Sequence, residues 1–186
     1  MHHYRNTLTQ WIPLAITITA ITGLIYLSGQ QQYRSMLNDP QLQLAQDSAR
    51  LIEAGVDSAV LAPKGSAIEI SASLAPWIAF YNTELEPQGS TGLLHGTIPQ
   101  LPEGVFAAAK AQGEEIVTWE PEAGVRQAVM VVSAGEDGYV VAGRNMSAVE
   151  GRIRNLGIVL LLGWIIALAV SVAGVHFAER LARRVV

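Results

Sequence analysis

LGIVLLLGWIIALAVSVAGVHF, residues Leu156 to Phe177, is a run of 22 residues without Asp, Glu, Lys or Arg. About 17–25 apolar residues in a helix are enough to cross the hydrocarbon core of a bilayer. A second uncharged run, WIPLAITITAITGLIYLS, extends over 18 residues from Trp11 to Ser28. Trp11, Tyr26 and Phe177 stand near the ends of these runs, where membrane interfaces favour aromatic side chains. The sequence therefore predicts two transmembrane helices, 11–28 and 156–177.

Each run has an alternative interpretation. The first is also compatible with a cleaved secretory signal, but its apolar core is longer than usual, its basic flank is thin, and no A-x-A site follows it. The second is also compatible with a buried core helix, which rarely contains so long an uninterrupted apolar run. Two uncleaved membrane spans are the favoured interpretation.

The composition agrees with a membrane protein. Half of the 186 residues are apolar and 15% are charged, whereas soluble domains average about 25% charged residues. The chain has no cysteine, which excludes disulfides, thiol nucleophiles and Cys-ligated metals. Its net charge of −4 argues against a nucleic-acid partner. No cofactor is expected.

The charge distribution suggests an orientation. Residues 29–155 carry 8 Lys plus Arg and 15 Asp plus Glu, a net −7, while the short ends are basic. Short basic ends remain in the cytoplasm and long acidic loops can be translocated. The predicted organisation is a cytoplasmic tail (1–10), a first span (11–28), an extracytoplasmic domain (29–155), a second span (156–177) and a second cytoplasmic tail (178–186). The expected location is the plasma membrane, the inner membrane of a bacterium.

The outer domain is predicted to begin with a helix. The first span is expected to continue outward to Leu37, and Asp39 with Pro40 has the pattern of a new helix start. The apolar positions that follow share one helical stripe, and Gly55 is a natural stop. These positions are Leu42, Leu44, Ala45, Ala49, Leu51, Ile52 and Ala54.

Strand patterns dominate the remainder of the outer domain. Alternating or β-branched runs predict strands at 67–73, 76–82, 117–120, 125–133 and 138–144, with a short helix at 103–112 and a loop at 83–102. Turn sequences separate the last three strands, which therefore form an antiparallel meander. Ser147-Ala-Val-Glu150 matches a capping box, and its helix is expected to continue directly into the second span. The predicted fold class is α+β, with two transmembrane helices bracketing an antiparallel sheet.

Two stretches carry a resemblance to a known family. They are PWIAFYNTELEPQGSTG (Pro76–Gly92) and GVRQAVMVVSAGEDGYVVAGRNMSAVEGRIRNL (Gly124–Leu156). Together with the long first helix and the exit helix, they resemble the PAS-like extracytoplasmic sensor domains known as PDC or Cache domains of bacterial histidine kinases and chemoreceptors. The resemblance covers residues 30–156. It implies a ligand site against the sheet and a signal that passes through the membrane helices.

The resemblance leads to two functional hypotheses. After the second span, the sequence Ala182-Arg-Arg-Val-Val186 resembles at most the first residues of a linker to an output domain. We therefore expect a non-enzymatic sensor or accessory protein that binds a small molecule or a partner and passes its state to a separate output protein. The alternative is a structural subunit or assembly factor of a larger membrane complex, with the outer domain as its docking surface.

The candidate ligand-binding residues are aromatic and basic. Aromatic side chains with one Arg suit a carboxylate-bearing molecule, provided that Arg126 points inward; the simpler interpretation is that the aromatic residues fill the core. The candidates are Tyr81, Trp119, Arg126 and Tyr139, chosen from a wider set that includes Trp77, Phe80 and Arg144.

Other polar groups give weaker signals. Clustered carboxylates at Glu114, Glu115, Glu120 and Glu122 suit Ca²⁺ or Mg²⁺, but their spacing matches no calcium loop and a solvated edge is favoured. His95 lies in a glycine-containing loop without a second His nearby, so a solvent-exposed histidine is expected there. No nucleophile–base motif is present, so neither a catalytic nor a metal site is predicted.

Both predicted spans carry small residues spaced four apart. Such stripes let helices pack closely in lipid, either within one chain, in a homodimer or with a partner membrane protein. The predicted packing residues are Ala15, Thr19 and Gly23 in the first span, and Gly163, Ala167 and Ser171 in the second.

Overall fold

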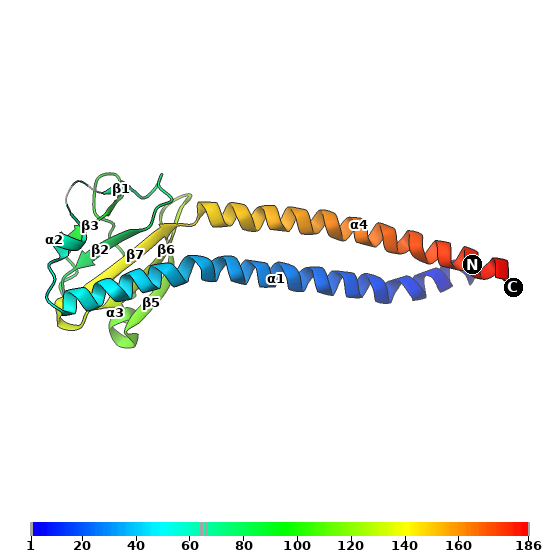
Figure 1. Cartoon of the computed structure of the whole chain (residues 1–186), viewed down its shortest axis with the longest axis horizontal. Helices are drawn as coiled ribbons and strands as arrows, with labels where there is room; N and C mark the ends of the chain where they lie inside the picture. The colour runs from blue at the N-terminus through cyan, green and yellow to red at the C-terminus, as the bar shows by residue number, and fades with distance from the viewer. Residues whose placement is uncertain (1, 64, 66, 186) are drawn as a thin grey trace. The chain divides into compact units, whose positions relative to one another are not determined.

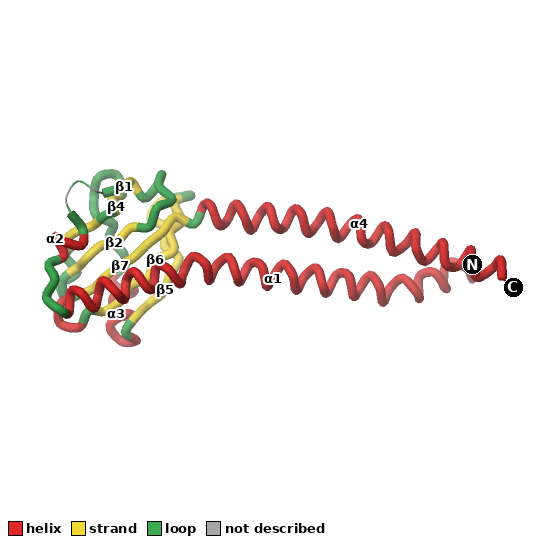
Figure 2. The backbone as a smooth tube through the Cα atoms, in the orientation of Figure 1, coloured by secondary structure: helices red, strands yellow, loops and turns green. Residues whose placement is uncertain are grey.

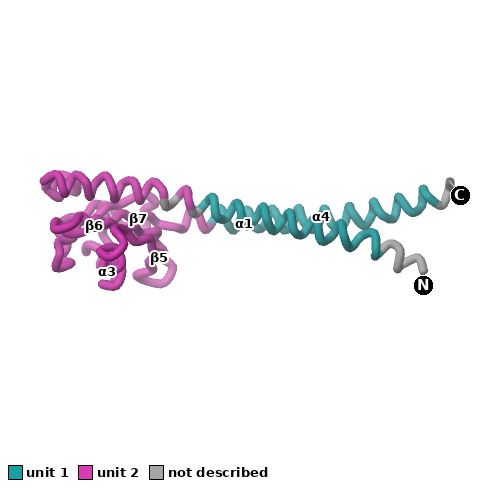
Figure 3. The backbone as a smooth tube through the Cα atoms, turned by 90° about the horizontal axis from the view of Figure 1, so that it is seen from below, with its two compact units in different colours: residues 1–33, 151–186 teal, residues 34–150 magenta. Residues whose placement is uncertain are grey.

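The computed structural model describes residues 2–63, 65 and 67–185. Met1 and Val186, the outermost residues of the two predicted tails, lie outside the described residues. The chain divides into two compact units, which Figure 3 colours separately. We call residues 1–33 with 151–186 the helical unit and residues 34–150 the sheet unit.

Two long helices supply the helical unit. They are α1 (His2–Glu53) and α4 (Ser147–Val185). The stretches Leu8–Tyr33 and Ser147–Ala182 have mean hydropathies of 1.7 and 2.7, and both are long and apolar enough to cross a membrane. Their large side chains are turned outward, including Ile16 at 64% and Val159 at 66% exposure. Such a continuous apolar surface is unfavourable in water and suits lipid.

The predicted helix start at Asp39-Pro40 is wrong. α1 continues without interruption from His2 to Glu53 and contains Pro40. A proline within a helix removes one backbone donor. Packing nevertheless favours the helix after it, because Gln41, Ala45 and Ala49 lie on one buried stripe. The predicted stop at Gly55 is close to the observed end, and Gly55 has the left-handed φ of +85°.

A five-stranded antiparallel sheet forms the centre of the sheet unit. Figures 1 and 2 show its strands side by side. The strand order is β3-β2-β7-β6-β5, so the first hairpin and the last three strands join through β2 and β7. The predicted α+β class with an antiparallel sheet is confirmed. The strands are β2 (Trp77–Tyr81), β3 (Pro87–Ser90), β5 (Glu114–Glu122), β6 (Val125–Ser133) and β7 (Tyr139–Asn145).

Several predicted boundaries need correction. The strand expected at 67–73 is reduced to β1 (Ile68–Glu69), which pairs in parallel with β4 (Gly92–Leu93). The expected loop 83–102 contains both β3 and β4. β3 was missed because Pro87 and Gly89 disfavour strands, yet an edge strand tolerates them. The helix predicted at 103–112 is confirmed as α3 (Glu103–Gln112). A short α2 (Ser58–Leu61) follows α1.

The two faces of the sheet are covered by different helices. Even-numbered residues of β6, such as Met130, pack with Ala45 and Ala49 of α1. Odd-numbered residues, such as Val129 and Val131, belong to a second core that includes Phe106 of α3. Figure 3 shows the α1 segment and α3 on opposite sides of the strands. This period-two alternation decides on which face each candidate residue lies.

Candidate functional site

A groove on the α3 side of the sheet unit contains one predicted ligand-binding residue, Trp119. We call it the Trp119 groove; its volume is about 780 Å³. This volume lies within the range of about 300–1,000 Å³ that is typical of small-molecule sites. Its walls are the segment 94–102 and the end of β5. The lining residues are Leu94, Thr97, Ile98, Pro99, Gln100, Leu101, Pro102, Trp119, Glu120 and Pro121.

A predicted tyrosine, Tyr81, supports the wall of the groove from within the core. The hydroxyl of Tyr81 donates a hydrogen bond to the carbonyl of Pro99. The ring of Phe106 stands edge-on to Tyr81 and to Tyr139, with ring centroids 5.1 and 5.3 Å apart. Burial raises the pKa of Tyr81, so this side chain remains a protonated donor. Tyr81 therefore holds the segment 94–102 at Pro99 without lining the groove. Tyr81 and Tyr139 instead line a smaller cavity of about 250 Å³ beside Ile52.

A tight turn at His95 closes one end of the segment. The Leu94 amide donates to the Thr97 carbonyl at 2.8 Å, and the Thr97 hydroxyl donates to the Leu94 carbonyl at 2.8 Å. His95 has a left-handed φ of +52°, which is uncommon for a residue other than glycine. Its backbone amide donates to Glu69 Oε2 at 2.9 Å, which holds the turn in place.

The His95 side chain links the turn to the end of β5. Its Nε2 lies 2.9 Å from Glu122 Oε2. The hydrogen bond to Glu122, and then the charges of Glu122 and Glu69, raise the pKa of His95. Hydrogen bonds from Ser71 are the main reason why the pKa of Glu69 is lowered. The predicted solvent exposure of His95 is confirmed, since 66% of its side chain is exposed. Its pairing with Glu122 was not predicted, because Glu122 is distant in the sequence and adjacent in space.

A buried polar network connects residues 68–71, which we call the β1 segment, with the start of α4. Trp77 Nε1 donates to Gln127 Oε1 at 3.2 Å, and Gln127 Nε2 donates to the Ile70 carbonyl at 3.0 Å. Asn145 Nδ2 donates to the same carbonyl at 3.2 Å. On its other side, Asn145 Oδ1 accepts from the Ser147 amide at 2.9 Å. Asn145 therefore contacts both the β1 segment and the first residue of α4.

This arrangement replaces the predicted capping box. The Ser147 amide is satisfied by Asn145, and the Glu150 amide donates to the Met146 carbonyl at 2.9 Å. The Glu150 side chain instead forms an ion pair with Arg126. The cap therefore comes from Asn145 at the end of the last strand, two positions before the predicted motif.

Arg126 does not lie with the aromatic candidates. Its even position on β6 gives it the parity of Ala128 and Met130, whereas Trp119 packs with the opposite core. It binds Glu150 and lies 3.7 Å from Glu120, with 46% of its side chain exposed. The structure does not bring the four predicted residues together at one surface. Trp119 lines the groove, Tyr81 bonds to its Pro99 wall, and Arg126 lies 3.7 Å from the lining residue Glu120.

The acidic residues singled out in the sequence are distributed over β5. Glu114 accepts a hydrogen bond from Gln46 at 2.8 Å, Glu120 accepts one from the Gly124 amide at 3.0 Å, and Glu122 pairs with His95. Within the described part of the chain, no group of three or more His, Asp or Glu side chains is placed to hold a metal ion.

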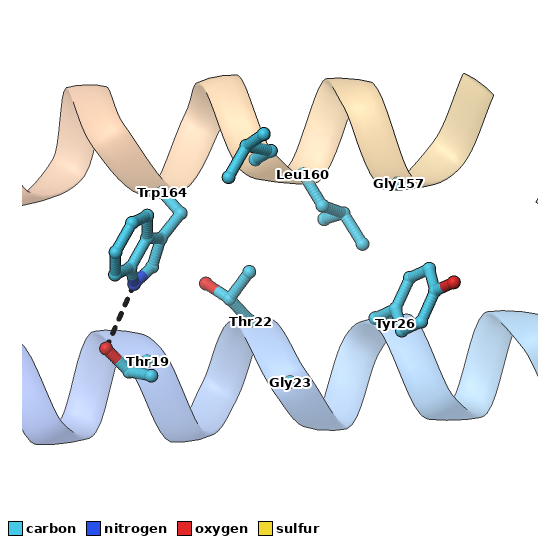
Figure 4. Close-up of a pocket in the computed structure, with 8 residues that line it drawn as sticks. Thr19, Thr22, Gly23, Tyr26, Gly157, Leu160 and Trp164 are labelled. Atoms are coloured by element: carbon cyan, nitrogen blue, oxygen red, sulfur yellow. Dashed lines mark hydrogen bonds between the residues drawn. The ribbon is translucent and has the colours of Figure 1, made fainter. Parts of the chain in front are cut away.

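Another cavity lies between α1 and α4 in the helical unit and is shown in Figure 4. Its volume is about 480 Å³, and its lining includes Thr19, Gly23 and Trp164. Trp164 Nε1 donates to Thr19 Oγ1 at 2.9 Å across the helices. A similar bond joins Trp11 Nε1 to Ser171 Oγ at 2.8 Å. Two indoles thus connect the helices through polar residues of the predicted stripes.

The other predicted packing residues differ in their surroundings. Ala15 and Ala167 are partly covered, whereas Gly163 is exposed. A Cβ added at Gly23 or Gly163 would meet no atom within 4 Å. These glycines therefore do not serve close backbone approach between α1 and α4. The predicted stripes do not include Trp164, whose indole bonds to Thr19 and lines the cavity.

Comparison with known proteins gives no assignment. No protein family, curated protein or solved structure matches this chain.

Proposed function

We propose that the chain is a non-enzymatic membrane sensor with a PAS-like extracytoplasmic domain of the PDC or Cache type. In this proposal, α1 and α4 each cross the plasma membrane once. Both ends of the chain are cytoplasmic, and the sheet unit lies outside. The sheet unit binds a small molecule or a partner and passes its state through α4 to an output module. The antiparallel sheet, the long α1 and the direct step from β7 into α4 support this interpretation.

The observation that carries the proposal is the position of Asn145. The His95 turn beside the Trp119 groove is bound to Glu69, and Glu69 belongs to β1. The next residue, Ile70, accepts a hydrogen bond from Asn145, which also caps α4 at Ser147. A displacement of the β1 segment must therefore break or move a hydrogen bond that ends at the start of α4. This is the contact that a signal from the groove to the membrane would need.

The coupling is testable without knowing a ligand. Glu69→Ala removes the acceptor for the His95 amide and loosens the β1 segment. We expect faster hydrogen exchange at the amides of Val149 and Glu150, both of which bond to the Met146 carbonyl. Couplings of about 0.5–2 kcal/mol correspond to about a 2- to 30-fold change in exchange rate. The measurement is mass-spectrometric exchange on the full chain in nanodiscs.

Two controls decide the interpretation. Glu86→Ala also removes a glutamate side chain that accepts a hydrogen bond, in this case from Asn82 in the β2–β3 turn. This control should leave the exchange rates of the α4 amides unaffected. In an Asn145→Ala background, Glu69→Ala should add no further effect, because the connecting side chain is gone. If Glu69→Ala and Glu86→Ala act alike on Val149 and Glu150, the sensor proposal fails.

The orientation has its own test. The sequence has no cysteine, so each introduced cysteine is unique. The Gln100→Cys variant should react with a membrane-impermeant maleimide in intact cells, and the Leu181→Cys variant only after permeabilisation. Reaction of the Leu181→Cys variant in intact cells would contradict the proposed orientation.

A second function has a specific observation in its favour. Tyr81, Phe106 and Tyr139 are at most 8% exposed, and the cavity that Tyr81 and Tyr139 line has a volume of only about 250 Å³. This volume is below the range of about 300–1,000 Å³ that is typical of small-molecule sites. A structural subunit of a membrane complex would need only an outer docking surface. Under this alternative, a stoichiometric partner should co-purify with the chain after cross-linking in native membranes, and Asn145→Ala should not alter its function unless the sheet unit unfolds.

A further inference from the structure

The five-stranded sheet has one protected edge and one open edge. β3 forms the first; it has only four residues, includes Pro87 and packs against α2, where a Cβ added at Gly89 would lie 3.6 Å from that of Ala62. Short strands, proline and covering elements keep further strands from adding to an edge. β5 forms the other edge with nine residues, none of which is buried. Up to Pro121, the edge at β5 therefore has none of these protections.

The backbone groups that β5 leaves unpaired follow from its register with β6. The Ser133 amide donates to the Gly113 carbonyl at 3.0 Å, and odd residues of β5 stand opposite odd residues of β6. Because bonded and non-bonded positions alternate along an antiparallel pair, the odd residues of β5 bond to β6 and the even residues point outward. The outward N–H and C=O groups include those of Ile116 and Thr118. Within residues 2–63, 65 and 67–185, no other backbone group bonds to them.

The side chains at this edge combine an apolar residue with carboxylates. Ile116 is 45% exposed, whereas its partner on β6, Met130, is fully buried. Two glutamates precede Ile116 on the same strand. Glu114 accepts a hydrogen bond from the neutral Gln46, and no Lys or Arg among the described residues forms an ion pair with Glu114 or Glu115. The first half of β5 therefore presents two carboxylates without a paired cation beside an exposed apolar side chain.

A second copy of this chain is a poor partner for the open edge. In an antiparallel pair of two β5 strands centred on Thr118, Glu114 of one copy would stand opposite Glu122 of the other. In a pair centred on Val117, Glu114 would stand opposite Glu120. Like charges at directly opposite positions destabilise such a pair, and charged edge strands are one means by which proteins avoid self-association. The same carboxylates favour a strand that carries positive charge.

We propose that the open edge of β5 binds an extended, basic segment of a partner protein by strand addition. The backbone groups of Ile116 and Thr118 form hydrogen bonds with the added strand, and Glu114 and Glu115 select Lys or Arg at the positions opposite them. In an antiparallel addition, the added strand has an apolar residue opposite Ile116, followed by two basic residues. This inference rests on the proposed function, in which a partner is one of two inputs, and it gives that partner a surface and a chemistry.

The test is the fluorescence anisotropy of a labelled peptide, TVTVIKKVT, titrated with the full chain in zwitterionic nanodiscs at about 0.15 M salt, where long-range attraction is screened. Thr118→Pro removes one outward N–H and leaves the bonds between β5 and β6, because an edge strand tolerates proline where its N–H faces solvent. We expect the peptide to bind this variant at least about tenfold more weakly. Thr118→Ser keeps the N–H and should change the affinity less than about twofold.

A second pair of variants examines the charges. Glu114→Gln combined with Glu115→Gln keeps an acceptor for Gln46 and removes both charges. We expect about 2- to 30-fold weaker binding, the range of two cross-strand charge pairs. Glu136→Gln combined with Asp137→Asn removes two charges from the turn 135–137 and should change the affinity less than about twofold. Melting temperatures are measured in parallel, and the charge variants decide the question if Thr118→Pro is unfolded.

The outcomes separate this inference from the proposed function. Weaker binding in Thr118→Pro and in the β5 charge variant, with both controls unchanged, supports it. Equal loss in the two charge variants, equal binding of the peptide TPTPIKKPT, which cannot form a strand ladder, a dimer of the chain that Thr118→Pro dissociates, or no binding at all overturns it. If TVTVIKKVT does not bind but Glu69→Ala still accelerates exchange at Val149 and Glu150, only the strand-addition site is wrong. If TVTVIKKVT binds and that coupling is absent, the sensor function is wrong.

Discussion

Replacement of Asn145 by Ala should lower the free energy of unfolding of the sheet unit by about 2 kcal/mol. Asn145 is 7% exposed and has three hydrogen-bond partners. Its Oδ1 satisfies the Ser147 amide, and loss of such a cap costs about 1 kcal/mol. Its Nδ2 donates to the Ile70 and Ser71 carbonyls at 3.2 and 3.4 Å.

The second contribution is limited by a neighbouring side chain. The Ile70 carbonyl keeps its hydrogen bond from Gln127, so only the Ser71 carbonyl loses its donor from Asn145. One such loss adds about 1 kcal/mol. The free energy of unfolding should therefore fall by about 2 kcal/mol. For a domain of this size, the melting temperature should fall by roughly 6–10 °C.

The assay is thermal unfolding of the full chain in detergent, followed by intrinsic tryptophan fluorescence. Asn82→Ala is a matched control, because Asn82 also bonds a backbone amide and a side chain, those of Glu86 at 2.8 and 3.1 Å. Water replaces those partners at the surface, so we expect less than about 1 kcal/mol there. If Asn145→Ala melts no lower than Asn82→Ala, Asn145 does not hold the β1 segment to α4.

Two further predictions concern packing and pH. Gly92→Ala should lower the free energy of unfolding by about 1–3 kcal/mol, because its Cβ would lie 2.6 Å from that of Trp77; Gly104→Ala, with no atom within 4 Å, should have no such cost in urea unfolding. His95→Asn should alter the pH profile of the melting temperature. Glu122 raises the pKa of His95, so their stabilisation is fully present below the unfolded pKa of about 6.5 and is lost as pH rises through the folded-state pKa. The difference between wild type and variant should shrink from pH 5.5 to pH 8.5, and a constant difference would contradict this assignment.

The sequence patterns predict the elements that carry a strong period. The two apolar helices, α3 and the strands β2, β6 and β7 were expected close to their observed positions, because hydrophobic periodicity and turn residues act locally. Failures occur where tertiary contacts override local propensity. Pro40 lies inside α1 because the residues after it pack on the sheet, and Pro87 lies in β3 because an edge strand tolerates it.

The site was less predictable because its residues are distant in the sequence. Trp119 was identified by residue type alone, whereas the segment 94–102 that faces it has no periodic signal. His95 and Glu122 are 27 residues apart, and no local pattern pairs them. The surroundings of Arg126 were not predictable for a different reason. The strand that contains Arg126 was predicted, and odd and even positions of a strand point to opposite faces of the sheet. Which of the two faces is covered by α1 and which by α3 is known only from the structure.

The polar network around Asn145 also bears on the choice between sensor and docking subunit. When both partners of a buried hydrogen bond are replaced by apolar residues of similar shape, the stability of the protein can remain nearly unchanged. Stability alone therefore does not require Gln127 and Asn145 at the centre of this core. Directional hydrogen bonds do something that apolar packing does not, since they fix one relative position of the β1 segment, β7 and the start of α4. A docking surface gains little from fixing these three elements to one another. A sensor requires it, because a signal can pass only where a change at one element has a definite consequence at the next.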